Sequence, residues 1–144
     1  MKAQDAKDLF ESGLECSQAI LGAFCDSYGL DKNIALKMST GLSAGMCCAG
    51  VCGAVSAAVL VIGCKYGHTR PEDVAVKTTC IGKVREFLDA FKERNGGRIS
   101  CRDILECDIF TPEGYQKATD EELFTTVCTD MVVKSATLLE ELGY

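Results

Sequence analysis

Apolar residues recur at helical spacing along almost the whole chain, and this pattern constrains the fold more than any other feature. Val84, Leu88 and Phe91, for example, follow one another at steps of three and four, the spacing of one helix face. Strand-like alternation is nearly absent, and no Pro/Ser-rich linker or shift in composition marks a domain boundary. The sequence therefore predicts an all-α fold, a single-domain bundle of about six or seven helices over residues 1–144.

Capping residues and glycines predict where these helices begin and end. Gly29 is expected to end the second helix, and Asp31 to cap the third. Ser100 and Asp103 resemble a capping box for a short sixth helix, and Thr119 and Glu122 resemble one for the last helix. The expected helices cover residues 3–12, 16–28, 32–42, 52–67, 71–94, a short segment after 100, and 120–142.

The ten cysteines are the unusual part of the composition. In a short secreted chain they would suggest a disulfide framework, but the N-terminal segment lacks the apolar core of a signal peptide. The longest apolar run, residues 53–63, is shorter than the about 20 residues of a membrane span. We therefore expect a cytoplasmic protein without membrane insertion, where cysteine clusters bind metal or carry out redox reactions. The net charge of −6 argues against nucleic acid as a partner.

Four cysteines have placements that bear on chemistry. Cys16, Cys52 and Cys101 each lie at the start of an expected helix, where free N–H groups and a partial positive charge lower a thiol pKa. Cys128 lies within the expected last helix, on its apolar stripe. From there its thiol could meet the other three from inside, or serve only as a small buried side chain.

Three further cysteines lie close to these positions: Cys47, Cys48 and Cys107. Cys48 precedes Cys52 by four residues, and Cys107 follows Cys101 by six. Thiols this near an activated cysteine can act as accessory ligands or as resolving thiols. The remaining three lie inside expected helices without a partner at ligand spacing, and we interpret them as core or incidental: Cys25, Cys64 and Cys80.

Four segments, in order along the chain, resemble the cysteine elements of one family. They are ECSQAIL around Cys16, SAGMCCAGVCGAVSAA around Cys52, NGGRISCRDILECDIFTPEGYQKA around Cys101 and VCTDMVVKSATLLEEL around Cys128. They are similar to the redox-active proteins named for the pattern C…CGAxxG…C…C, the C_GCAxxG_C_C family. Ala57 stands where that pattern ends in glycine, which keeps the position small. The resemblance implies a redox role for these four cysteines.

Two functions compete for the same four residues. In the first, Cys16, Cys52, Cys101 and Cys128 form a thiol redox site, with Cys52 favoured as the nucleophile and a neighbouring thiol resolving the mixed disulfide. Its partner would be a redox protein or a small thiol or disulfide, and the chain would be an oxidoreductase or an electron carrier. In the second, the same cysteines bind an iron–sulfur cluster or zinc. The absence of any C-x-x-C motif counts against the second hypothesis. A third, weaker hypothesis is an interaction module whose cysteines only pack.

Overall fold

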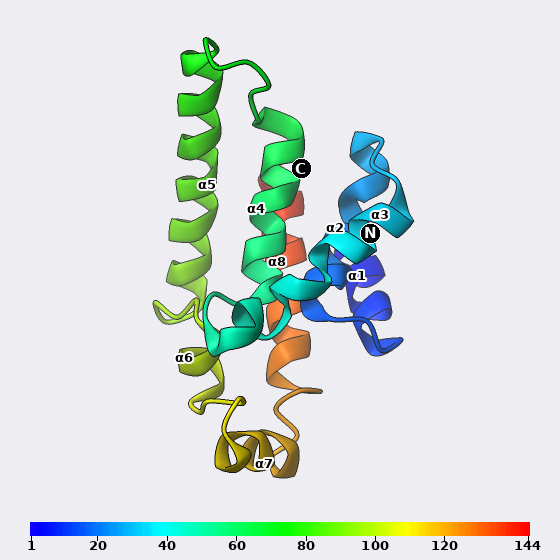
Figure 1. Ribbon diagram of the computed structural model, residues 1–144, viewed down its shortest axis with the longest axis vertical. Coiled ribbons are helices and arrows are strands. Elements are labelled where there is room, and N and C mark those ends of the chain that lie inside the picture. Colours follow the sequence, from blue (N-terminus) through cyan, green and yellow to red (C-terminus); the bar gives the residue numbers. More distant parts are fainter.

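The computed structural model describes residues 1–144 and contains eight α-helices and no β-sheet (Figure 1). The predicted all-α bundle is confirmed, with one helix more than the sequence indicated. The helices are α1 (Lys2–Glu11), α2 (Cys16–Phe24), α3 (Lys32–Ser39), α4 (Gly53–Tyr66), α5 (Val74–Arg94), α6 (Cys101–Leu105), α7 (Pro112–Asp120) and α8 (Val127–Glu141). No helix combines the length and the apolar character that crossing a membrane requires.

The centre of the bundle is formed by α4 and α8. In Figure 1, α5 runs along one side of this pair and α1 to α3 lie on the other, with α6 and α7 at one end. Phe24 of α2, Phe87 and Phe91 of α5 and Leu139 of α8 are fully buried in the core. Removing each such side chain from water stabilises the fold by about 1.5–3 kcal/mol.

Small residues allow the neighbouring helices to approach α4 closely. Ala54, Ala57 and Ala58 are completely buried, and α2, α5 and α8 all pack against this helix. The hydroxyl of Ser135 on α8 donates a hydrogen bond of 2.7 Å to the carbonyl of Ala54 in the first turn of α4. The beginning of α4 is therefore held inside the bundle.

Several predicted boundaries are confirmed by their caps. Gly29 ends the second helical segment in the left-handed conformation, with φ of 66°. The Asp31 carboxylate accepts a hydrogen bond of 2.9 Å from the backbone N–H of Ile34 and begins α3. The hydroxyl of Ser100 accepts one of 3.1 Å from the N–H of Asp103 and begins α6. These caps are local, so the sequence shows them directly.

The prediction of one long final helix over residues 120–142 is wrong. The chain forms α7, breaks in a turn where Glu122 has φ of 55°, and begins α8 only after it. Thr119 does not cap a helix, because its hydroxyl donates back to a carbonyl within α7. Thr111 is the cap that begins α7, with proline following it. As a result, Cys128 lies in the first turn of α8, not in the middle of a helix.

Candidate thiol site

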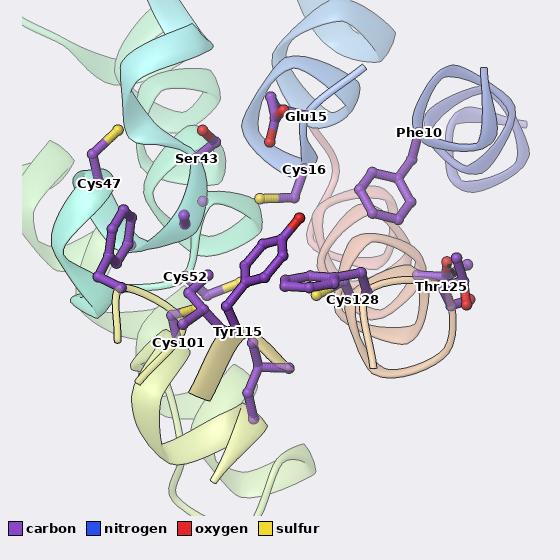
Figure 2. Close-up of a pocket in the computed structure, with 18 of the residues that line it drawn as sticks. Phe10, Glu15, Cys16, Ser43, Cys47, Cys52, Cys101, Tyr115, Thr125 and Cys128 are labelled. Carbon is purple, nitrogen blue, oxygen red and sulfur yellow. Dashed lines mark hydrogen bonds between the residues drawn. The ribbon is translucent and has the colours of Figure 1, made fainter. Parts of the chain in front are cut away.

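The N-terminal ends of four helices converge on one cavity of about 1140 Å³ (Figure 2). Each end contributes one of the four cysteines singled out from the sequence. Cys16 is the first residue of α2, Cys52 directly precedes α4, Cys101 is the first residue of α6, and Cys128 is the second of α8. All four line the cavity. The structure thus brings together four thiols that are far apart in the chain.

A backbone bridge places Cys52 beside Cys101. The N–H of Cys52 donates to the carbonyl of Ile99 at 2.8 Å, and the N–H of Cys101 donates to the carbonyl of Gly50 at 2.6 Å. These two bonds form an isolated antiparallel bridge between the segments that lead into α4 and α6. Because a bridge of this length has no periodicity, the sequence pattern did not indicate it.

Cys16 is positioned by the start of α2 and by a glycine on α4. The N–H of Glu15 donates to the Gln18 side chain at 2.9 Å, which fixes the first turn of α2. Gln18 also donates to the carbonyl of Leu36 at 3.1 Å and so ties this turn to α3. A Cβ atom at Gly53 would lie 2.6 Å from the Cys16 sulfur. Glycine at this position therefore lets the sulfur rest against the beginning of α4.

A strained loop runs along the cavity before α4. Ala44, Gly45, Met46 and Cys47 all have positive φ, between 52° and 64°. Residues other than glycine cost about 1–2 kcal/mol each in this left-handed conformation. Such strain persists where the surrounding structure enforces it, and it clusters at functional sites. Here the loop directs the backbone N–H of Ala44 to the sulfur of Cys16.

Cys16 and Cys52 form an asymmetric pair. A hydrogen bond from the Cys52 thiol is the largest cause that lowers the pKa of Cys16, from 9.0 to about 7. Burial opposes this shift, and the N–H groups of Ala44 and Ser17 reinforce it. The pKa of Cys52 is raised well above its ordinary value, because this thiol donates to Cys16 and is buried. Near neutral pH Cys16 is therefore about half thiolate while Cys52 stays protonated, whereas the sequence-based hypothesis favoured Cys52 as the nucleophile.

The other two thiols of the group stay protonated. Burial is the main cause that raises the pKa of Cys101 to about 11 and that of Cys128 to about 12. The negative charge of Cys16 raises both further. The site consequently holds one thiol that ionises near neutral pH and three that stay protonated.

This geometry agrees with what the comparisons with known proteins found. Residues 14–142 match the family described as "Putative redox-active protein (C_GCAxxG_C_C)". The chain belongs to this family. No curated protein and no solved structure matches the chain. Membership in the C_GCAxxG_C_C family supports a redox role for the chain.

The additional cysteines of this family member lie at the edge of the site or outside it. Cys47 lines the cavity, is exposed, and donates to a backbone carbonyl 3.6 Å away. Cys48 is exposed and lies outside the cavity lining, with its thiol 3.3 Å from a carbonyl of its own loop. Cys107 is half-buried and does not line the cavity, although it contributes to the raised pKa of Cys101. The three cysteines interpreted as core or incidental also lie outside the lining: Cys25, Cys64 and Cys80.

The thiols surround open space and do not form a closed ligand shell. All ten cysteines are free. No group of three or more histidine, cysteine, aspartate or glutamate side chains lies close enough together to hold a metal ion. This spacing does not fit a single tetrahedral zinc ion, whose sulfur ligands lie about 2.3 Å from the metal.

The aromatic walls of the cavity were not predicted from the sequence. Phe10 of α1, Phe110 and Tyr115 around α7, and Phe124 in the turn before α8 all line it. The rings of Tyr115 and Phe124 pack with their centroids 5.6 Å apart. The Thr-Pro pair at residues 111–112 is the signal that could have located α7 and with it Tyr115.

Proposed function

We propose that this protein is a thiol–disulfide redox protein in which Cys16 is the nucleophile and Cys52 the resolving thiol. One observation supports the assignment above all others. Cys16 and Cys52 both line the wall of an open cavity, and the Cys52 thiol lowers the pKa of Cys16 to about 7, so part of Cys16 is thiolate at neutral pH. The thiolate is the reactive form of cysteine in exchange with disulfides.

The exchange follows in two steps. The Cys16 thiolate attacks one sulfur of a disulfide R–S–S–R′, forms the Cys16–S–S–R bond, and releases R′S⁻. The proton of Cys52 passes to this departing thiolate. The Cys52 thiolate then attacks the Cys16 sulfur, forms the Cys16–Cys52 disulfide, and releases RS⁻. Two electrons move from the protein to the substrate, and a partner dithiol returns them by the reverse exchange.

The structure offers a physical reason for this order of events. Two of the causes that raise the pKa of Cys52 are its hydrogen bond to Cys16 and the negative charge of Cys16. Both vanish once Cys16 is bound in a mixed disulfide. The pKa of Cys52 therefore falls at the moment when Cys52 must ionise, so the resolving thiol is activated only after the first step.

Trapping the mixed disulfide tests this proposal. Cys52→Ser protein treated with a disulfide should accumulate a mixed disulfide at Cys16, because no resolving thiol is present to release it. Cys16→Ser protein should accumulate none at Cys52, whose pKa is high. Cys25→Ala is the matched control, since Cys25 is buried in the core outside the cavity. Peptide mass spectrometry that finds the label chiefly on Cys52 in the wild-type protein would contradict the assignment.

An iron–sulfur cluster is the second candidate, and one observation favours it. Four cysteines from four helix ends face a single cavity with room for a group between them. Cys16, Cys52, Cys101 and Cys128 would be the ligands, and the cluster would supply one-electron transfer. Iron and sulfide analysis of protein purified without air distinguishes the two functions. Stoichiometric iron and sulfide with visible absorption would favour the cluster, and colourless protein with ten titratable thiols would favour thiol exchange.

A further inference from the structure

The outer part of the cavity is aromatic. Phe10 and Tyr115 point into the space in front of the cysteines (Figure 2). Phe110 and Tyr115 are 53% and 58% exposed, although both are large and largely apolar. Aromatic rings left exposed at the mouth of a cavity leave apolar surface that a bound molecule can cover.

The same cavity lacks positive charge. No lysine, arginine or histidine is among its lining residues, whereas Glu11 and Glu15 both are. The Cys16 thiolate adds a further negative charge on the inner wall. Molecules that carry carboxylates or phosphates, such as glutathione, nucleotides and coenzyme A, would meet repulsion without any compensating basic side chain.

Resting on the proposed thiol chemistry, we infer that the cavity binds an uncharged aromatic two-electron acceptor, either a quinone or an aromatic disulfide. Its ring would lie between the aromatic walls and meet the sulfur of Cys16 at the inner end. The cavity volume of about 1140 Å³ is sufficient for a molecule of several rings.

The reaction balances for both kinds of acceptor. With a quinone, the Cys16 thiolate, the Cys52 thiol and one proton from water give the Cys16–Cys52 disulfide and the hydroquinone. The two quinone oxygens take the two electrons and two protons. With an aromatic disulfide, the Cys16 thiolate breaks the S–S bond, Cys52 resolves the mixed disulfide, and two aromatic thiols leave, one of them as thiolate.

Matched reagents test the preference for an uncharged ring. Reduced protein is mixed with dithiodipyridine, which is aromatic and uncharged, or with dithiobis-nitrobenzoate, which is aromatic and dianionic. The rate at Cys16 is read by quenching and peptide mass spectrometry, with exposed Cys64 on α4 as internal control outside the cavity. The ratio of the uncharged to the anionic rate should be about tenfold higher at Cys16 than at Cys64. Equal ratios at the two thiols would overturn the inference.

Rim variants test the role of the aromatic walls. Phe110→Ala and Tyr115→Ala should each lower the rate of the reaction of dithiodipyridine with Cys16 about fivefold. They should leave the rate with methyl methanethiosulfonate, which is uncharged, small and aliphatic, unchanged. Val76→Ala is the matched control, because Val76 is exposed on α5 outside the cavity. Glu11→Lys should raise the rate of the reaction of Cys16 with the dianionic reagent only. A uniform effect of the rim variants on all reagents would overturn the proposed role of the rings.

Under anaerobic conditions, reaction with a fully substituted quinone distinguishes the two classes of acceptor. If the reduced protein forms hydroquinone and the Cys16–Cys52 disulfide in equal amounts, the acceptor class includes quinones. Oxidation by dithiodipyridine alone would assign the site to aromatic disulfides. Both results support an uncharged aromatic acceptor. Failure of both reagents to produce the Cys16–Cys52 disulfide would overturn the proposed function as well. Equal uncharged-to-anionic rate ratios at Cys16 and Cys64, with the Cys16–Cys52 bond formed, would overturn only the present inference.

Discussion

Replacing Cys52 with alanine should raise the pKa of Cys16, because the Cys52 thiol is the largest cause of its lowered value. The present shift runs from 9.0 to about 7. At about 1.4 kcal/mol for each pKa unit, it corresponds to a preference for the thiolate of about 3 kcal/mol. Burial already opposes this preference. Without the donor, burial and the charge of Glu15 act against two backbone N–H groups, and the pKa should return toward 9.0, its ordinary value.

The expected change in reaction rate at neutral pH is smaller than the change in thiolate population. The thiolate fraction of Cys16 falls from about one half to about one in a hundred. Each remaining thiolate becomes about six- to tenfold more nucleophilic, because nucleophilicity rises with pKa. The net alkylation rate should therefore fall about five- to eightfold near pH 7 and exceed the wild-type rate above about pH 8.

The assay is the pH dependence of iodoacetamide alkylation at Cys16, read by peptide mass spectrometry. Cys52→Ser is the matched control, since its hydroxyl can still donate to the Cys16 sulfur and should keep the midpoint well below that of Cys52→Ala. Neither variant can form the disulfide, so the comparison isolates the hydrogen bond from the redox step. A midpoint that stays near 7 in Cys52→Ala would refute the account of the pair.

Three further predictions concern the surroundings of the pair. Gly53→Ala should lower the free energy of unfolding by about 1–3 kcal/mol, because the new Cβ would lie 2.6 Å from the Cys16 sulfur. Gly63→Ala on the same helix is the control, because its Cβ would meet no atom within 4 Å, and it should raise the free energy of unfolding slightly. Urea unfolding measures both changes. Burial raises the pKa of Cys128 from 9.0 to about 12, so this thiol ionises more readily in the unfolded chain. The free energy of unfolding under reducing conditions should therefore fall as pH rises above about 9, and less steeply in Cys128→Ala; equal slopes would contradict the assignment. Ser135→Ala should lower the free energy of unfolding by about 1–2 kcal/mol through loss of a buried hydrogen bond, without moving the alkylation midpoint of Cys16.

The sequence was most informative where the determining interaction is local. Gly29 and Asp31 end and begin helices through contacts with residues a few positions away, so their roles follow from the sequence alone. The placements of Cys16 and Cys101 at helix starts follow from the same kind of signal. Helical periodicity then sufficed for the fold class, because it depends only on which residues face the core.

The turn before α8 contains neither glycine nor proline, the residues that usually break a helix, so the sequence did not predict it. Glu122 has positive φ although it is not glycine, and nothing in its neighbourhood in the sequence indicates this conformation. Thr119 resembled a helix cap in the sequence, but the residue that caps a helix here is Thr111. This error alone placed Cys128 in mid-helix, and its correction adds a fourth helix start to the site.

The division of charge between the two central thiols depends on tertiary contacts that no local pattern contains. Cys52 and Cys16 both stand at helix starts, and this placement favours ionisation of each. Cys16 ionises more readily because Ala44, held in a strained loop, and Cys52, just before another helix, both donate to its sulfur. Those contacts exist only after the segments have packed.

The most direct test of the central claim is an equilibrium redox titration of the purified protein, with each disulfide identified by peptide mass spectrometry. We expect the first disulfide to join Cys16 to Cys52, and we expect Cys16→Ser to abolish it. A first disulfide between any other two cysteines, with Cys16 still free, would contradict it.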